Sequence, residues 1–351
     1  MQLYNLDFSA EEIHQAAAAN RLLSMEIEFS RACNFRCVYC YLENRTAAAD
    51  ELEPAEIRDV ILQAEALGAR KIIILGGEPS IYPRLIDMLR FIGSRGLTIE
   101  IFTNGSGITA DLAKVLAEEK ARVVLKMNSR MAEVQDRLAG TQGAFAVIDA
   151  ALAQLRRAGY PGPGLVLAIS TIICRQNIAE LPQLWQWLRQ QDIEPYFEVL
   201  TPQANAADNQ WLHVPAEELH RLFTELAAID RDQFGRNWQP QPPLVGNRCM
   251  RHQVSCLVTA RGEVMPCVGV TIPLGNIRQA RLADILQGSE VLNNLKNFRQ
   301  TITGPCRTCE KSAECYGCRG AAYQLTGDYL ASDPTCWRNT NCPADGSLSE
   351  K

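Results

Sequence analysis

Residues 30–44 read SRACNFRCVYCYLEN and place three cysteines, Cys33, Cys37 and Cys40, within eight residues. Three thiolates on one short loop can converge on a single metal centre. Zinc usually takes a fourth protein ligand, and none of the four histidines of the chain falls in this loop. Three cysteines without a fourth ligand suit a [4Fe–4S] cluster with one iron left open. The alternatives are a zinc loop or three unrelated thiols.

The cysteine loop directly follows the first of six short apolar segments that alternate with longer amphipathic ones. The expected strands are 25–29, 71–75, 97–103, 122–127, 165–173 and 194–200, and the expected helices between them are 53–68, 82–95, 109–119, 143–158 and 179–190. The strands are rich in Ile, Val and Phe, as parallel strands buried on both faces are. The repeat predicts a parallel α/β sheet, doubly wound or part of a barrel, with ligands at the C-terminal ends of the strands.

A change of pattern follows the sixth strand. A helix is expected over 215–229, and NWQPQPPLVGN at 237–247 then predicts an extended linker because its three prolines break the periodicity. We therefore expect an N-terminal segment at 1–23, an α/β domain at 24–236, and a linker with a cysteine-rich domain at 237–351. The last part has few long apolar runs, so metal is expected to serve as its scaffold.

The composition limits the class of protein further. The chain has 351 residues and 13 cysteines, and a chain of this length needs no disulfide bridges to form a core. It shows no export signal and no apolar run of about 18 residues. We therefore expect a cytoplasmic protein, without membrane contact, whose thiols bind metal or react. The net charge of −5 argues against nucleic acid as a partner.

Two further motifs follow the cysteine loop. The second strand ends in Gly76-Gly77-Glu78-Pro79, the third ends in Thr103-Asn104-Gly105, and Tyr39 places an aromatic residue before Cys40. With these features the sequence resembles the radical S-adenosylmethionine (radical SAM) enzymes over roughly residues 24–200. The resemblance implies a partial (β/α)6 barrel and a cluster on Cys33, Cys37 and Cys40. It also implies that the open iron takes the amino and carboxylate groups of S-adenosylmethionine (SAM).

The resemblance assigns cofactor contacts and chemistry. Gly76, Gly77 and Glu78 would bind the SAM amino group, and Pro79, Tyr39, Thr103 and Asn104 would belong to the same site. The family reduces its cluster with a donor such as flavodoxin or ferredoxin. SAM then yields a 5′-deoxyadenosyl radical that abstracts hydrogen from an unactivated carbon, while the protein positions the reactants and excludes water.

The sequence departs from that family at the fourth strand. Many relatives have a Ser-Leu-Asp-Gly-like end and an Arg-Gly soon after, whereas this chain has Lys126-Met127-Asn128-Ser129 and Ala139-Gly140. We hypothesise that Lys126 replaces the missing arginine as the cation for the SAM carboxylate; the alternative is an exposed lysine at a strand end. Ser170, Thr171 and Glu198 are other polar residues at barrel positions, where they contact SAM or substrate or form structural hydrogen bonds.

The remaining cysteines follow a second pattern, Cys249-x12-Gly262-x4-Cys267, Cys306-x2-Cys309-x5-Cys315-x2-Cys318, then Cys336. It resembles the SPASM extension of radical SAM enzymes, which modifies peptides in many members, except that CYGC has two intervening residues where the family has three. The resemblance implies a β-hairpin, a helix and two auxiliary [4Fe–4S] clusters, hence three clusters in all. In the family, one auxiliary cluster lies nearer the active site and is called the near cluster here; the resemblance assigns it Cys249, Cys256, Cys267 and Cys318. The other, the distal cluster, takes Cys306, Cys309, Cys315 and Cys336.

Several alternatives remain for these cysteines. Cys306, Cys309, Cys315 and Cys318 could instead form one four-thiolate zinc site. Cys342 is a tail thiol or a replacement ligand. Cys174 ends the fifth strand, where it is a small buried apolar residue or a catalytic hydrogen-atom donor of the kind some radical epimerases use.

The reaction is less defined than the cofactors. Val268 stands where sulfatase-maturing relatives have an aspartate base, which argues against formylglycine formation. Two classes of oxidoreductase remain, one acting on a peptide or protein side chain by cross-linking, dehydrogenation or epimerisation. The other oxidises or epimerises a small molecule such as a sugar or aminocyclitol. The run Thr201-Pro202-Gln203 and the loop at 202–214 could line either site, and family habit favours the peptide. A non-catalytic iron–sulfur scaffold is the third possibility.

Overall fold

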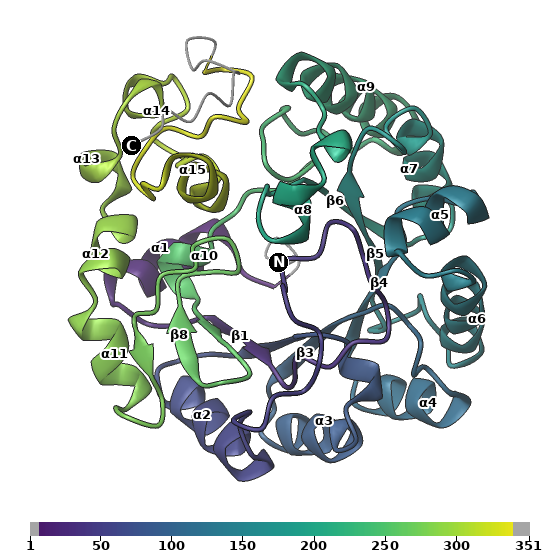
Figure 1. The fold of residues 1–351 in the computed structure, drawn as a ribbon, viewed down its shortest axis with the longest axis horizontal. Coiled ribbons are helices and arrows are strands. Elements are labelled where there is room, and N and C mark those ends of the chain that lie inside the picture. The colour runs from purple at the N-terminus through teal and green to yellow at the C-terminus, as the bar shows by residue number, and fades with distance from the viewer. Residues whose placement is uncertain (1–6, 340–351) are drawn as a thin grey trace.

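The computed structural model describes residues 7–339 and contains the expected parallel sheet. Its six parallel strands are β1 (Ser24–Glu28), β2 (Lys71–Leu75), β3 (Thr98–Thr103), β4 (Arg122–Lys126), β5 (Leu167–Ile173) and β6 (Glu194–Val199). Each strand pairs with the next one along the chain. Figure 1 shows the sheet curving around a central space with helices on its outer side. The prediction of a partial (β/α)6 barrel is confirmed.

The helices cover the outer face of the sheet. They are α2 (Pro54–Ala66), α3 (Leu85–Ser94), α4 (Ala110–Glu118), α5 (Ala132–Ala139), α6 (Ala144–Arg157), α7 (Leu181–Gln190) and α9 (Ala216–Phe234), with the short η2 (Pro79–Ile81), α8 (Asn205–Asp208) and η3 (Gln210–Leu212) near the strand ends. Sequence periodicity missed α5 and the N-terminal α1 (Ala10–Ala18) because each buries too few apolar residues to show a repeat. A capping box between Ser9 and Glu12 starts α1.

Side chains alternate between the two faces of every strand. On β1, Met25 and Ile27 belong to the main core under the helices, whereas Glu28 lines the interior of the barrel. The inward residues of the other strands include Leu75, Phe102, Lys126, Ser170 and Glu198. Acidic, basic and hydroxyl groups therefore lie inside an otherwise apolar barrel.

An ion network closes the barrel at the N-terminal ends of its strands. The ammonium of Lys71 lies 2.7 Å from Asp7 and 2.6 Å from Glu100, and Arg122 lies 2.6 Å from the other oxygen of Asp7. Lys71 and Glu100 are fully buried. The barrel is therefore filled at this end, and space for a ligand lies at the opposite end, where the cysteine loop follows β1.

The cysteine-rich part extends the same sheet. Strand β7 (Leu257–Val258) pairs in parallel with β1, and β8 (Glu263–Met265) and β9 (Gly275–Asn276) continue in antiparallel pairs to give the strand order β6-β5-β4-β3-β2-β1-β7-β8-β9. The expected hairpin is thus β7–β8. Short helices follow or precede it: α10 (Arg251–Val254), α11 (Leu282–Gly288), α12 (Glu290–Lys296), α13 (Phe298–Thr301), α14 (Pro305–Thr308) and α15 (Arg319–Thr326).

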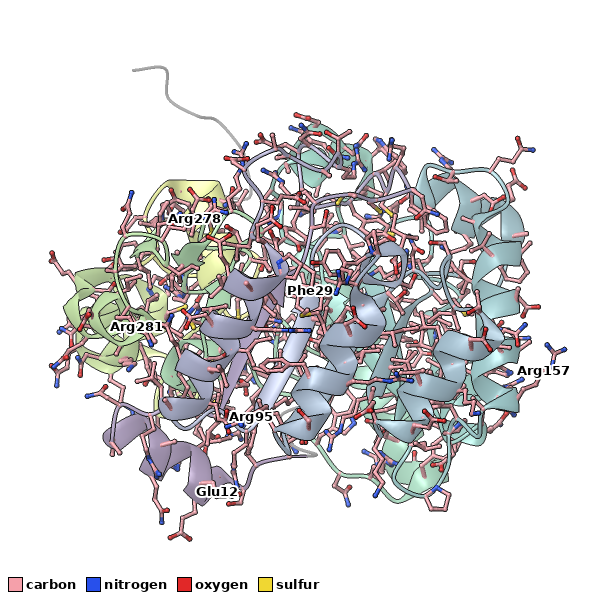
Figure 2. The ribbon with its side chains drawn as sticks, turned by 90° about the horizontal axis from the view of Figure 1, so that it is seen from below. Glu12, Phe29, Arg95, Arg157, Arg278 and Arg281 are labelled. Atoms are coloured by element: carbon pink, nitrogen blue, oxygen red, sulfur yellow. The ribbon has the colours of Figure 1, made fainter. Side chains whose placement is uncertain are left out.

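Side-chain contacts fix this part to the barrel. Arg278, labelled in Figure 2, holds the carboxylate of Glu56 on α2 through two nitrogens at 2.6 and 2.7 Å, and it donates to the carbonyls of Asp50 and Glu51. At the other side, the ring of Trp337 stacks on His220 of α9 with centroids 5.1 Å apart. Within residues 7–339, no single helix is long and apolar enough to cross a membrane, and only the sharply bent pair α5–α6 has the required length and composition.

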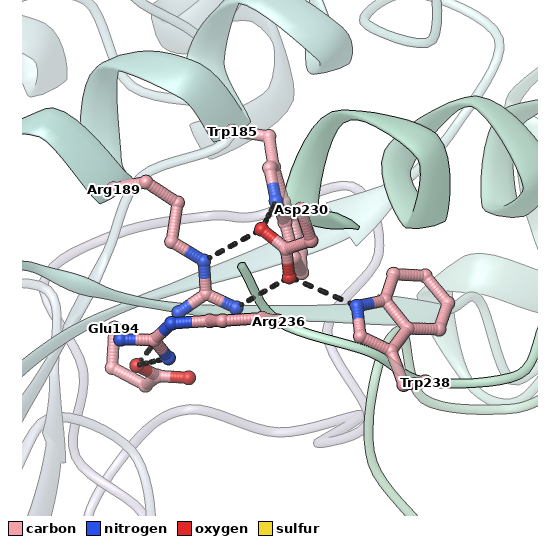
Figure 3. Close-up of polar contacts among 6 residues, drawn as sticks. All are labelled: Trp185, Arg189, Glu194, Asp230, Arg236 and Trp238. Atoms are coloured by element: carbon pink, nitrogen blue, oxygen red, sulfur yellow. Dashed lines mark hydrogen bonds and ion pairs between the residues drawn. The ribbon is translucent and has the colours of Figure 1, made fainter. Parts of the chain in front are cut away.

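The expected linker is anchored rather than free. Figure 3 shows the buried carboxylate of Asp230 on α9 accepting hydrogen bonds from the indoles of Trp185 and Trp238, at 2.7 and 2.9 Å. It also accepts two from the guanidinium of Arg189, at 3.0 and 2.9 Å. Beyond Trp238, the main chain at 243–245 pairs with β6. The stretch 237–247 therefore closes the β6 side of the barrel.

Candidate active site

The Gly76-Gly77-Glu78-Pro79 motif lies beside the cysteine loop. The amide of Gly77 donates to the carbonyl of Ser30 at 2.8 Å, and the amide of Glu78 donates to the carbonyl of Ala32 at 2.8 Å. These bonds continue the pairing of β2 with the segment that leads into the loop. The motif is thus held against Cys33 by main-chain contacts.

The carboxylate of Glu78 joins the ends of β2 and β3. One oxygen accepts from the amide of Ser80 at 2.8 Å and from the hydroxyl of Thr103, and the other accepts from the amide of Asn104 at 2.6 Å. Burial raises the pKa of Glu78, and these hydrogen bonds oppose the rise. Pro79 begins the short helix η2. Both carboxylate oxygens of Glu78 therefore already accept hydrogen bonds from other groups of the protein.

The cysteine loop is shaped by hydrogen bonds to its main chain. Arg45 and Asn205 donate to the carbonyl of Cys37 at 3.2 and 3.0 Å, and the amide of Asn205 donates to the carbonyl of Cys40 at 3.3 Å. The amide nitrogen of the Asn104 side chain lies 3.9 Å from the sulfur of Cys33. The loop is thus held by its backbone, which leaves the three sulfurs available as ligands.

The environment of these thiols favours coordination over free thiolates. Burial raises the pKa of Cys33 to about 11 and that of Cys37 to about 12, and it also raises the pKa of Cys40. Uncoordinated, all three would be protonated at neutral pH. A bound metal centre would supply the positive charge that keeps them deprotonated.

Lys126 points into the barrel beneath the cysteine loop. Its ammonium donates to the hydroxyl of Ser170 at 3.2 Å and lies 4.9 Å from the ring centroid of Tyr39. Burial lowers the pKa of Lys126, and Glu198 and Cys37 are among the groups that oppose this. Lys126 is therefore a partly buried lysine inside the barrel, not an exposed lysine at a strand end.

Replacing Lys126 with alanine should weaken SAM binding several-fold, because it removes a desolvated cation from the expected carboxylate side of the site. Calorimetric titration of SAM into the anaerobically reconstituted protein measures this. Lys114→Ala, on the exposed face of α4, is the matched control and should bind as the parent does. Equal affinities for Lys126→Ala and the parent would refute the role.

Three other residues on β5 and β6 were predicted from the sequence to contact SAM or substrate, and their side chains do not all point to the same face of the sheet. Ser170 and Glu198 face the interior with Lys126, and one oxygen of Glu198 is buried without a hydrogen-bond partner in the described part of the chain. Thr171 points to the opposite face, where its hydroxyl donates to the carbonyl of Met127 at 2.6 Å. For Thr171 this contact favours the alternative of a structural hydrogen bond, because neighbouring residues of a strand point to opposite faces.

Cys174 is fully buried. Its amide donates to the side-chain oxygen of Asn177 at 2.9 Å, its sulfur lies 3.4 Å from the same oxygen, and it packs with Leu138 and Leu212. It does not line the cavity described below. Of the two alternatives for Cys174, these contacts favour a small buried apolar residue over a catalytic hydrogen-atom donor.

Two separate groups of cysteines form in the second part of the chain. In the first, Gly269 and Gly320 cross so closely that a Cβ on Gly269 would lie 2.7 Å from the Cα of Gly320. Only glycine permits this approach, and it brings the Cys267 loop against the start of α15, where Cys318 caps the helix. Burial, and then the nearby groups Asp333, Cys249 and Cys267, raise the pKa of Cys318 to about 12.

The second group surrounds a small cavity, which is lined by Cys306, Cys309, Cys315 and Cys336 but not by Cys318. Asn339 donates to the sulfur of Cys306 and Gly317 donates to that of Cys315, both at 3.3 Å. Although only two residues lie between Cys315 and Cys318 in CYGC, the two cysteines therefore belong to different groups. The cavity thus brings Cys306, Cys309 and Cys315 together with Cys336 and not with Cys318, which disfavours the four-thiolate zinc site.

Cys256 does not join either group. It is buried in the main core with Met25 and Val258, on the helix-covered face of the sheet. The assignment of Cys256 to the near group is therefore not supported by its position. Cys342 lies outside the described residues.

A cavity of about 230 Å³ lies between the cysteine loop and the β7–β8 hairpin. Its wall includes Glu28 and Tyr41 from the barrel, Leu257 and Val268 from the cysteine-rich part, and Gln203 from the loop after β6. The amide group of Gln203 donates to the carbonyl of Val268 at 3.0 Å. Its oxygen is buried and has no partner among the described residues. The cavity thus reaches from the first cysteine loop to the chain that carries Cys267.

Two residues of this cavity escaped the sequence reasoning. Glu28 accepts from the hydroxyl of Tyr41 at 2.9 Å and from the amide of Ala260 in the hairpin at 3.2 Å. Burial raises the pKa of Glu28. The available signal was an acidic residue at an inward position of an apolar strand, SMEIE, with Tyr41 directly after Cys40.

Comparison with known families covers both parts of the chain. Residues 27–188 match the model of the radical SAM superfamily, and residues 249–310 match the model of an iron–sulfur cluster-binding domain. The first match spans β1 to α7 and includes the cysteine loop and Gly76-Gly77-Glu78-Pro79. The second includes the near cysteines Cys249 and Cys267.

Individual proteins are similar along most of their length. An AdoMet-dependent heme synthase of Methanosarcina barkeri is 27% identical, with 91% of this chain and 96% of that protein covered. A PqqA peptide cyclase of Methylocella silvestris is 28% identical, with 88% and 86% covered. The crystal structure of Streptococcus suis SuiB bound to its precursor peptide SuiA has a TM-score of 0.69 at 18% identity, covering 92% of this chain and 78% of that one, which shows a shared fold.

Proposed function

Because the chain belongs to the radical SAM superfamily and carries a SPASM iron–sulfur domain, we propose that it is a peptide-modifying oxidoreductase. In this proposal it cleaves SAM reductively and removes hydrogen from an unactivated C–H bond of a peptide or protein side chain. The product is a cross-linked, dehydrogenated or epimerised residue. The cluster and SAM, when bound, supply the 5′-deoxyadenosyl radical.

The protein residues hold and orient these groups. Cys33, Cys37 and Cys40 hold the first cluster, and the main chain at Gly76 and Gly77 meets the SAM amino group. Glu78 acts mainly by fixing the ends of β2 and β3, since its oxygens already accept hydrogen bonds from the protein. Lys126 faces the SAM carboxylate from inside the barrel. The buried ion network at the other end of the barrel keeps water out from below.

The auxiliary clusters are assigned from the two cysteine groups. Cys249, Cys267 and Cys318 hold the near cluster, and Cys306, Cys309, Cys315 and Cys336 hold the distal one. Hydrogen bonds to sulfur from Asn339, Gly317 and Ala321 adjust the stability of the reduced clusters. A flavodoxin or ferredoxin is the proposed electron donor.

The cavity is the observation that carries the proposed substrate site. Its wall is shared by the radical-forming loop and the SPASM hairpin, so a group inside it meets both parts of the enzyme. Its volume of about 230 Å³ is smaller than the roughly 300–1,000 Å³ typical of pockets for drug-sized ligands. It therefore suits one amino-acid side chain better than a large rigid molecule. The similarity to a PqqA peptide cyclase supports the same substrate class.

A small-molecule substrate is the second candidate. The similarity to an AdoMet-dependent heme synthase favours it, since that name describes a product that is not a peptide. A sugar or aminocyclitol alcohol would fit the cavity by volume, with Gln203 and Glu28 as hydrogen-bond partners. The two candidates use the same SAM site and differ only in the occupant of the cavity.

Anaerobic reconstitution tests the cofactor part of the proposal. With three clusters, the protein should bind about twelve iron per chain and release 5′-deoxyadenosine when reduced in the presence of SAM. The variant C33A/C37A/C40A should keep about eight iron and release none. Four iron with bound zinc, or equal 5′-deoxyadenosine release by the variant, would refute the proposal.

The substrate class requires a separate assay. The reduced enzyme is given short peptides encoded near its gene and, in parallel, sugars and aminocyclitols, each deuterated at carbon. Substrate raises 5′-deoxyadenosine release above the substrate-free rate and transfers deuterium into it. Transfer from peptides only supports the first candidate, and transfer from small molecules only supports the second.

A further inference from the structure

We propose that, among the described residues, three thiolates hold the near auxiliary cluster, those of Cys249, Cys267 and Cys318, and that its fourth iron is open to a small exogenous donor. The motif implies four cysteines for this cluster, with Cys256 as the fourth. The inference rests on the auxiliary clusters of the proposed function, but it concerns ligation and not the substrate.

The register of β7 against β1 fixes the direction of the Cys256 side chain. Glu26 pairs with Leu257 and Ile27 pairs with Val258. Neighbouring residues of a strand point to opposite faces, and those two apart share a face. Cys256 therefore points the same way as Val258, and both pack with Ile27 in the helix-covered core. Leu257 points the other way, into the cavity.

The chain around Cys256 cannot easily turn its sulfur to the other face. The amide of Glu26 donates to the carbonyl of Cys256 at 2.9 Å, and the amide of Leu23 donates to the carbonyl of Val254 at 2.8 Å. These bonds attach both ends of the segment to the barrel. A one-residue slip would expel Val258 from the core and break both bonds.

The other three cysteines lie on the interior side. Cys249 packs against an inward cluster that contains Val124, Ala168 and Tyr196. Cys267 is followed by Val268, which lines the cavity, and the crossing of Gly269 with Gly320 holds it beside Cys318. The sheet thus separates Cys256 from the near group.

Iron content tests the ligand assignment directly. In the background C33A/C37A/C40A, which keeps only the auxiliary clusters, about eight iron are expected per chain. Adding Cys256→Ala or the space-filling Cys256→Val should leave this number unchanged, as should Cys174→Ala, the control for a buried cysteine. Cys249→Ala should lower it to about four. Loss of about four iron in both Cys256 variants, with Cys174→Ala unaffected, would overturn the proposal.

A spectroscopic probe tests the open iron without altering Cys256. Imidazole is titrated into the reduced C33A/C37A/C40A protein, and the electron paramagnetic resonance spectrum is recorded. An open iron should bind imidazole and shift the signal of one cluster, and Cys249→Ala should abolish that shift. An unchanged spectrum means that a protein group already fills the position, which overturns the open-iron proposal.

These outcomes are separable from those of the proposed function. If the protein with all its cysteines releases 5′-deoxyadenosine while the Cys256 variants lose iron, only the ligation proposal fails. If it binds no auxiliary iron at all, the proposed function fails first. The iron counts and spectra require no knowledge of the substrate.

Discussion

Gly77→Ala should lower 5′-deoxyadenosine formation by at least about 100-fold, because an error of about 1 Å in positioning costs this much. A Cβ at position 77 would lie 2.1 Å from the carbonyl oxygen of Ala32 and 2.4 Å from that of Arg31. These are main-chain atoms of the segment that enters the cysteine loop, so they cannot move independently of Cys33. The methyl group therefore pushes the SAM-binding turn and the cluster loop apart.

The measurement is SAM cleavage and SAM affinity of the reconstituted variant, together with its iron content. Gly288→Ala at the end of α11 is the matched control, since nothing lies within 4 Å of a Cβ there. It should cleave SAM at the parental rate. A Gly77→Ala protein with parental activity would show that the contact between the two loops is not needed for the site.

Asp230→Ala should destabilise the protein by about 3–5 kcal/mol, the usual cost of leaving a buried charge without its partner. The substitution removes the acceptor for both indoles and for the guanidinium of Arg189 at once. The Arg189 side chain is only 7% exposed, so the substitution leaves a buried guanidinium with one carboxylate fewer. Arg189 keeps one contact with Glu194, at 2.8 Å. The melting temperature should fall by roughly 4–7 °C.

Thermal unfolding followed by circular dichroism measures this loss. Asp232→Ala is the matched control on the same helix, since Asp232 pairs with Arg231 in an ion pair whose side chains are 61% and 58% exposed. An exposed pair of this kind contributes about 0–1 kcal/mol. If the two variants melted at the same temperature, the Asp230 network would not be a major source of stability.

The barrel was predictable because each strand and helix carries its own periodic signal. β2 begins and ends where the apolar run 71–75 does, and the other five strands agree within two residues at each end. An apolar run does not predict which of its residues face the interior of the barrel, because the direction of each side chain depends on how the strand pairs with its neighbours. Ser170 and Thr171 were therefore equal candidates, and only the register of β5 distinguishes them.

In the cysteine-rich part, the sequence predicted which cysteines lie near one another better than it predicted the strands. Its strands have two or three residues, too few for alternation to be visible. The spacing of Cys306, Cys309 and Cys315 follows one loop and was sufficient to group them. The position of Cys256 depends instead on β1, and Glu28 meets the hairpin at Ala260 for the same reason. No local pattern records contacts between such distant segments.

The pairing of β1 with β7 has a consequence for how this protein is made. Glu28 and Ala260, which meet at this junction, lie 232 residues apart in the chain. At 5–20 residues per second, a ribosome needs roughly 10–50 s to synthesise the intervening segment. Throughout that time β1 can pair with β2 while its other edge exposes unpaired main-chain groups, a template for aggregation. A nascent chain released before residue 258 should therefore depend on chaperones far more than the completed protein does.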